Sequence, residues 1–131
     1  MAFHTNIIEV TRENENFRKV VFTGKKSQLV VMSLLPGVEI GAETHEGTEQ
    51  TLIFLSGKGK AVIDGVESEV KAGDVYVITP GEKHNFINNG EEPLKIYTVY
   101  APANHLDGRV HATKEAADAD QEDEDFGHRA K

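Results

Sequence analysis

Short apolar segments that end at turn residues constrain the fold of this chain more than any other feature. Between residues 17 and 101, no segment keeps apolar residues at the three-to-four-residue spacing of an amphipathic helix over several turns. Asp64-Gly65 is the strongest turn signal, because a two-residue hairpin loop needs positive φ angles that these residues tolerate. The expected strands are residues 17–22, 28–35, 52–55, 60–63, 66–71, 75–79, 84–87 and 94–100. Such a series of short antiparallel strands predicts an all-β sandwich or barrel.

The length and the charge distribution predict one domain followed by a tail. A chain of 131 residues suits one ordinary domain, and we expect the barrel domain to occupy residues 1–112. Residues 113–131 carry seven acids against three bases, which is half of the net charge of -8. Because this segment has little apolar surface to bury beyond Phe126, we expect a short frayed helix or a disordered acidic tail.

The composition excludes several classes of function. The chain has no cysteine, so disulfides, thiolate ligands and cysteine nucleophiles are unavailable to it. Its acidic balance disfavours a nucleic-acid partner, which normally requires a clustered basic face. No apolar run approaches the length that spans a membrane, so we expect no membrane partner and a cytoplasmic protein.

Two spaced patterns of glycine, histidine and acidic or amide residues stand within the expected barrel. The first pattern consists of Gly37, Glu43, His45, Gln50 and Gly57. The second pattern consists of Gly73, Pro80, Gly81, His84 and Asn88. Glu43 and His45 are two residues apart on an extended segment, so their side chains are expected to point to the same face.

In their order and spacing, these patterns resemble the two motifs of the cupins, a family of small jelly-roll β-barrels, over roughly residues 30–100. The resemblance implies a cupin-type jelly-roll β-barrel. In the family's first motif, Glu43 stands where a histidine is usual and Gln50 where a glutamate is usual. In the second motif, Thr79 holds the usual proline position and Pro80 follows it. Two spaced motifs in the right order are a stronger signal than either motif alone.

The resemblance also implies a metal site inside the barrel, formed by Glu43, His45, Gln50 and His84. Two imidazoles, a carboxylate and an amide suit one divalent transition metal per chain, and Fe, Mn, Zn, Ni and Co all remain open. Glu49 is the alternative to Gln50, because the family allows three or four residues after the histidine. The six-residue distance to Gly57 favours Gln50, whereas Glu49 would shift the strand register by one residue. Cupins that have lost their metal and serve as a scaffold or pocket are the other alternative.

Three function hypotheses remain open at this point. The first is a metal-dependent enzyme of the isomerase or dioxygenase type that acts on a small carbonyl- or sugar-like molecule, with Glu43 as a possible base. The second is a non-catalytic module that binds or senses a small-molecule ligand. The third is a metal-free epimerase that uses histidine and tyrosine as acid and base. By alternation in the last strand, Tyr100 is the tyrosine expected to point inward, together with Leu94, Ile96 and Thr98.

Residues outside the two motifs lead to further expectations. His105 and His111 follow the last strand, and this stretch resembles a subset of small cupins labelled mannose-6-phosphate-isomerase-like. A role for His105 at the edge of the pocket competes with that of an ordinary loop histidine, whereas His4 and His128 are expected to be exposed. The segment up to Phe22 is expected to add or exchange a strand in a homodimer, because edge strands of small sheets are commonly covered by a second copy.

Overall fold

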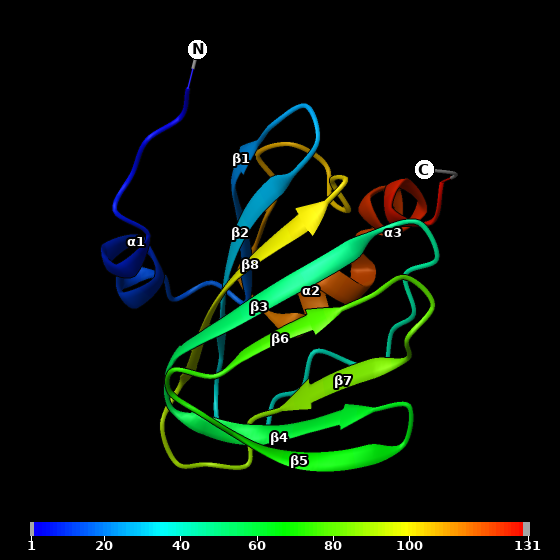
Figure 1. Ribbon diagram of the computed structural model, residues 1–131. Coiled ribbons are helices and arrows are strands. Elements are labelled where there is room, and N and C mark those ends of the chain that lie inside the picture. The colour runs from blue at the N-terminus through cyan, green and yellow to red at the C-terminus, as the bar shows by residue number, and fades with distance from the viewer. Residues whose placement is uncertain (1, 130–131) are drawn as a thin grey trace.

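The computed structural model describes residues 2–129 and consists mainly of two antiparallel sheets (Figure 1). The larger sheet has the strand order β6-β3-β8-β2-β1-β9, and the smaller has the order β5-β4-β7. The strands are β1 (Arg18–Thr23), β2 (Gln28–Leu34), β3 (Glu49–Ser56), β4 (Lys58–Ile63), β5 (Val66–Lys71), β6 (Val75–Ile78), β7 (His84–Ile87), β8 (Leu94–Ala101) and β9 (Val110–His111). The helices are α1 (Ile7–Glu13), α2 (Lys114–Ala119) and α3 (Gln121–His128). The all-β prediction is therefore confirmed, with short helices added at both ends.

The turn residues behave as their sequence pattern predicts. Asp64 and Gly65 have φ angles of 48° and 83°, and they connect β4 to β5 as a tight hairpin. Gly57, the last residue of the first pattern, has a φ of 89°. A Cβ atom at this position would lie 2.7 Å from the carbonyl oxygen of Pro93, so both the backbone angle and the close approach require glycine.

The interior of the barrel changes from apolar to polar along its length. In β8, Leu94, Ile96, Thr98 and Tyr100 all point inward, as predicted. Leu94 and Ile96 pack with Phe54 and Phe86 in the apolar half, where each fully buried side chain contributes about 1.5–3 kcal/mol through the hydrophobic effect. Thr98 and Tyr100 belong to the other half, which also holds the inward side chains of Gln50 and His84. The polar end of the barrel is therefore the place to look for a site.

The N-terminal segment contains a helix that the sequence did not predict. Asn6 caps α1 by accepting a hydrogen bond from the backbone N–H of Glu9 at 3.0 Å. The helix lies against β2, β3 and β8, and the outward side chain of Lys95 donates a hydrogen bond to the carbonyl of Asn14 at its end. Seven residues span only about two turns, which is too short for a clear helical periodicity in the sequence.

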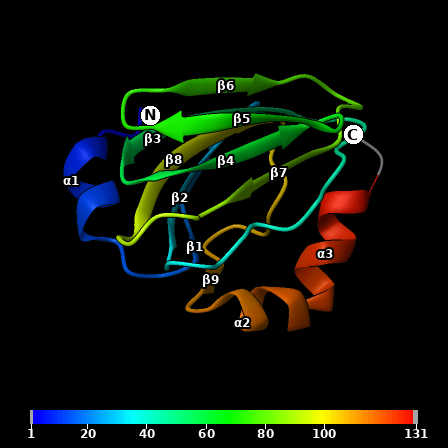
Figure 2. The same cartoon turned by 90° about the horizontal axis from the view of Figure 1, so that it is seen from below.

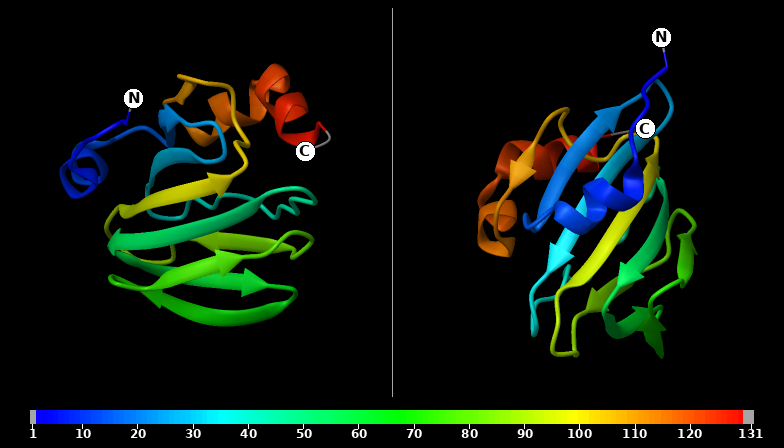
Figure 3. Two further views of the ribbon diagram at one scale, coloured as in Figure 1. Left: turned by 45° about the horizontal axis from the view of Figure 1, so that its top comes forward. Right: turned by 90° about the vertical axis from the view of Figure 1, so that its left-hand side faces the viewer.

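The C-terminal segment forms two helices that pack on the barrel. Figure 2 shows α1 on one side of the barrel and the C-terminal helices on the other, and Figures 1 and 3 show α3 opposite the β4–β5 hairpin. Asp120 begins α3 by accepting a hydrogen bond from the N–H of Asp123 at 3.1 Å. Of the two expectations for the tail, the helix is the one found, and the buried side chain of Asp123 holds it in place. No helix within residues 2–129 is long and apolar enough to cross a membrane.

Candidate metal site and ligand pocket

Strand pairing brings three of the four predicted ligands together at the polar end of the barrel. The backbones of Glu43 and His84 exchange two hydrogen bonds of 2.9 Å, so their side chains project from directly opposite positions on one face. His45 follows two residues after Glu43, and its ring centre lies 5.1 Å from that of His84. The backbone register therefore places these three side chains on one face of the barrel interior.

Gln50 faces the same interior from β3, and its amide orientation follows from its neighbours. It is only 3% exposed, whereas Glu49 is exposed, so the register is the one that favours Gln50 over Glu49. The hydroxyl of Thr98 donates its only hydrogen to the carbonyl of Thr51 at 2.9 Å, so it can only accept from Gln50. Nε2 of Gln50 therefore points at Thr98, 3.1 Å away. Its Oε1 is buried and has no hydrogen-bond partner within residues 2–129.

The two histidines present nitrogens that suit metal binding. Nδ1 of His84 lies 2.9 Å from the carbonyl of Glu82, which fixes the proton on Nδ1 and leaves the Nε2 lone pair for a ligand role. Burial lowers the pKa of His84, which favours the neutral imidazole that a metal requires. Nε2 of His45 is buried 3.1 Å from Oε2 of Glu43, a contact that is an ion pair when the ring is protonated, and it has no hydrogen-bond partner among the described residues.

Glu43 keeps its negative charge in this setting. Burial alone would raise its pKa, but the contact with His45 and the positive charge of Arg18 together lower the pKa to about 2. Nη2 of Arg18 lies 4.0 Å from Oε1 of Glu43, and the Glu43 side chain is 31% exposed. A carboxylate with so low a pKa is a weak proton acceptor, so Glu43 suits a ligand role better than that of a general base.

These residues fit a divalent transition metal by donor type, but their atoms are not yet gathered around one point. Oε1 of Gln50 and Nε2 of His45 are buried and have no hydrogen-bond partner among residues 2–129. Such atoms are available to coordinate a metal ion. However, the nitrogen and carboxylate atoms of Glu43, His45 and His84 do not all lie within 4.8 Å of one another. Within the described part of the chain, His111, Asp120 and Asp123 are the group of this kind that does.

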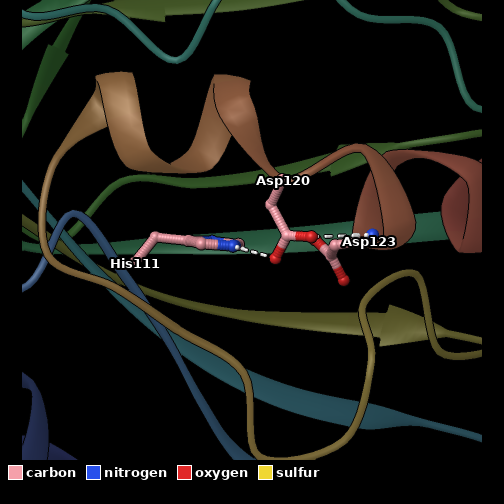
Figure 4. Close-up of side chains that lie close together, drawn as sticks. All are labelled: His111, Asp120 and Asp123. Atoms are coloured by element: carbon pink, nitrogen blue, oxygen red, sulfur yellow. Dashed lines mark hydrogen bonds and ion pairs between the residues drawn. The ribbon is translucent and has the colours of Figure 1, made fainter.

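The cluster of His111, Asp120 and Asp123 is a docking network rather than a metal centre (Figure 4). Both oxygens of Asp120 accept hydrogen bonds, from Nε2 of His111 at 2.9 Å and from the N–H of Asp123. Both oxygens of Asp123 are also occupied, by the N–H of Leu106 at 2.6 Å and by Nδ1 of His105 at 2.7 Å. Arg109 adds a positive charge 3.4 Å from Asp120, which further disfavours a cation. The network fastens α3 to β9 and to the loop that precedes it.

A second wall of the site comes from the loop after β8. Nε2 of His105 lies 3.3 Å from the hydroxyl of Tyr100, while its Nδ1 contacts Asp123. Burial and the charge of Arg18 lower the pKa of His105 to about 4, so the ring is neutral, with the proton on Nδ1. Gln28 holds this loop, because its Oε1 accepts from the N–H groups of Asn104 and His105 and its Nε2 donates to the carbonyl of His105 at 2.7 Å.

A pocket of about 230 Å³ opens between the two walls. Its lining includes Arg18, Glu43 and His45 from the barrel, and His105 and Asp123 from the loop and α3. Gln50 and His84 are buried and do not belong to this lining. His105 therefore lies at the edge of the pocket, as one of the two interpretations of the sequence expected, whereas His128 is exposed at its rim.

Sequence reasoning missed three residues that build this site. Arg18 shares the inward parity of Val20 in β1, and a charged residue at such a position is a signal that could have been used. Gln28 is a buried amide at the start of a strand. Asp123 follows the capping residue Asp120 by three positions, but it lies among so many acids that nothing in the local sequence sets it apart.

Comparisons with known proteins are consistent with this architecture. A family model described as a cupin domain matches residues 30–100. The uncharacterised protein YrkC of Bacillus subtilis is 38% identical over 118 residues, which cover 86% of this chain and 63% of YrkC, so the chain spans less than two thirds of that relative. An oxalate-binding protein of Thermotoga maritima is 35% identical over 68 residues, which cover 52% of this chain and 56% of that protein. The crystal structure of BH2720 from Bacillus halodurans has a TM-score of 0.89 and 35% identity, and the match covers 91% of this chain and 95% of that one.

Proposed function

Because the chain belongs to the cupin family, we propose that it is a metal-binding single-domain cupin that acts on a small carbonyl- or sugar-like molecule. The proposed ligands of one divalent transition metal per chain are Glu43, His45, Gln50 and His84. The observation that carries the proposal is the burial of Oε1 of Gln50 and Nε2 of His45 without a hydrogen-bond partner in the described chain. Buried polar atoms are rarely left unpaired, and a bound ion is one of the partners that can complete them.

The residues of the pocket divide into binding and positioning roles. A bound divalent metal supplies a Lewis acid that polarises an oxygen atom of the ligand. His84 is oriented for binding by the carbonyl of Glu82, and Gln50 by Thr98. On the opposite wall, the neutral ring of His105 accepts from Tyr100 and donates to Asp123, which keeps its orientation fixed at the pocket edge.

Elemental analysis of the protein purified without chelator or affinity metal tests the metal proposal. We expect about one metal ion per chain in the wild type and its loss in His45→Ala and His84→Ala. His4→Ala is the matched control, because it removes an exposed histidine far from the barrel interior and should keep the metal. Wild-type protein that holds no metal even after reconstitution with Fe, Mn, Zn, Ni or Co would contradict the proposal.

A non-catalytic small-molecule binding cupin is the alternative function. The small volume of the pocket and the likeness to an oxalate-binding protein support a small ligand, whether or not the ligand is turned over. A panel of sugars, sugar phosphates and carbonyl compounds, assayed for isomerisation and for oxygen consumption, separates the two functions. Turnover of a panel member by the metal-loaded protein supports an isomerase or dioxygenase, and inertness across the panel with one metal bound favours the binding module.

We also propose a homodimer. Val75 and Val77 are exposed on β6, which is an edge strand of the larger sheet, and apolar side chains on an edge favour pairing with a second copy. Residues 18–22 are less suited to adding a strand to a partner, because within this chain β1 is already paired with both β2 and β9. Light scattering is expected to give twice the chain mass, and a monomer mass would contradict the proposal.

A further inference from the structure

Arg18 is a buried cation that points into the ligand pocket. Its side chain is 8% exposed, and it lines the pocket together with Glu43, His45 and His105. A guanidinium group stays charged at any physiological pH and carries five N–H donors. Burying such a group is costly unless opposite charge and hydrogen-bond acceptors surround it.

The acceptors around Arg18 do not complete its hydrogen bonding. The nearest carboxylate oxygen, Oε1 of Glu43, lies 4.0 Å from Nη2, at the outer limit of an ion pair. The phenol of Tyr100 is a further polar neighbour, and the ring of Phe17 lies 5.2 Å below the guanidinium carbon. Nε of Arg18 is buried and has no partner among residues 2–129. Asp123 does not supply one; its oxygens accept from His105 and Leu106.

Two carboxylates act on the charge of Arg18, namely Glu43, which is its ion-pair partner, and Asp123. If Glu43 binds a metal, as proposed above, its charge is shared with the metal, and Arg18 keeps only the charge of Asp123, whose oxygens already accept from His105 and Leu106. A guanidinium in this situation pairs best with a planar two-oxygen anion, because its parallel N–H donors match both oxygens. The missing partner is therefore expected to come from the ligand.

We propose that Arg18 anchors the carboxylate of a small anionic ligand in this pocket, with the rest of the ligand facing Glu43 and His45. The proposal names the ligand class of the metal site proposed above and rests on that function. The pocket of about 230 Å³ is below the range of roughly 300–1,000 Å³ that accommodates drug-sized molecules. This size suits an acid of a few carbon atoms.

The lining favours a carboxylate over a phosphate. Arg18 is the only Arg or Lys among the lining residues within the described chain, while Glu43, Asp123 and Glu124 supply acidic groups. A dianionic phosphate would meet this acidic lining with a single counter-charge, whereas a monoanionic carboxylate is neutralised by Arg18 alone. Inorganic phosphate therefore serves as a competitor in the test.

The experiment follows the Nε–Hε resonance of Arg18 by NMR while acetate, lactate or phosphate is added to the protein. Acetamide and lactamide are the neutral controls for acetate and lactate. Titrations are run on metal-free and on metal-loaded wild type, on Arg18→Gln, on Arg18→Lys, and on Arg12→Gln. Arg12 is an exposed arginine of α1, so its removal controls for a general loss of positive charge. Metal content is measured separately on every variant.

We expect at least one carboxylate to shift the Arg18 resonance and to bind at least tenfold more tightly than its amide. Arg18→Gln should weaken that binding at least tenfold and remove the preference over the amide, while Arg12→Gln binds like the wild type and metal content stays unchanged. Arg18→Lys should fall between the wild type and Arg18→Gln. The resonance of the wild type keeps the test valid if either Arg18 variant fails to fold.

Three outcomes would overturn the inference: no carboxylate shifts the resonance, amides bind as well as acids, or phosphate binds more tightly than every carboxylate. These failures differ from failure of the proposed function. If the metal-loaded protein binds no carboxylate, only the proposed ligand class is contradicted. A protein without metal that still binds a carboxylate at Arg18 contradicts only the metal site.

Discussion

The two walls of the pocket satisfy their polar atoms in different ways. The barrel wall, which we define as Glu43 and His45 of the pocket lining together with the buried residues Gln50 and His84, leaves Oε1 of Gln50 and Nε2 of His45 without a hydrogen-bond partner in the described residues. The helix wall, formed by His105 and Asp123, has both ring nitrogens and both carboxylate oxygens engaged. Unpaired buried atoms cost stability and are retained where a ligand completes them, whereas fully paired networks hold structure. We therefore expect changes in the barrel wall to affect binding and changes in the helix wall to affect folding.

The largest expected effect is the loss of stability in Asp123→Ala. This change leaves Nδ1 of His105 and the N–H of Leu106 without their acceptor in a buried position, which costs about 3–5 kcal/mol of unfolding free energy. Urea unfolding monitored by circular dichroism measures it. Asp125→Ala is the matched control, because it removes an exposed carboxylate from the same helix and should cost less than about 0.5 kcal/mol. Equal costs for the two variants would contradict the structural role of the helix wall.

Gln28→Leu should have the next largest effect. Leucine fills much of the same volume but leaves the N–H groups of Asn104 and His105 without their acceptor, which costs about 2–3 kcal/mol. Native-state hydrogen exchange is expected to speed up at these two amides before it does so in β3 or β8. Protection that falls uniformly over the barrel would show that Gln28 does not act on the loop in particular.

The helix wall should also make the metal-free protein sensitive to acid. The pKa of His105 is lowered from an ordinary value of 6.5 to about 4 in the folded state, so between these values the unfolded chain binds more protons. Stability is therefore lost as the pH falls from about 6.5 toward 4, by up to roughly 1.4 kcal/mol per pH unit for one proton. Thermal unfolding of wild type and of His105→Asn across this range measures the contribution. A slope in His105→Asn as steep as that of the wild type would exclude His105 as its source.

The smallest expected effect on stability is that of Gln50→Leu. The change removes an unpaired buried Oε1 together with one hydrogen bond to Thr98, so the metal-free protein should change by no more than about 1 kcal/mol in either direction. Metal affinity should fall at the same time. Isothermal titration and urea unfolding of the same preparations separate the two readouts. A large loss of stability with unchanged metal affinity would place Gln50 with the structural residues.

The barrel wall was predictable because the regular alternation of side chains along a strand determines which residues point inward. Alternation in β3 and β8 gives the inward side chains, and the spacing to Gly57 selects Gln50 over Glu49. The prediction for the ligand role of these residues stays untested, since the structure tests only where they point. Even so, the strand positions and the polar end of the barrel follow from local patterns.

The helix wall was not predictable from local patterns. His105 and Asp123 are 18 residues apart and belong to a loop and a helix whose docking depends on Gln28, 77 residues before His105. Local composition described residues 113–131 as acidic and poor in apolar side chains, so nothing indicated that one carboxylate among seven would be buried. The short helix α1 was not predicted for a related reason. Its position depends on contacts with the larger sheet and not on its own periodicity.

The double use of the Asp123 carboxylate has a consequence for how such sequences diverge. One oxygen fixes the tautomer of His105, and the other holds the backbone of the loop at Leu106. A substitution at position 123 alone would leave the buried imidazole of His105 without its hydrogen-bond acceptor. A substitution at position 105 alone would leave the buried carboxylate of Asp123 without one of its donors. Positions 105 and 123 are therefore expected to co-vary among related chains, with both polar residues kept or both replaced by apolar ones.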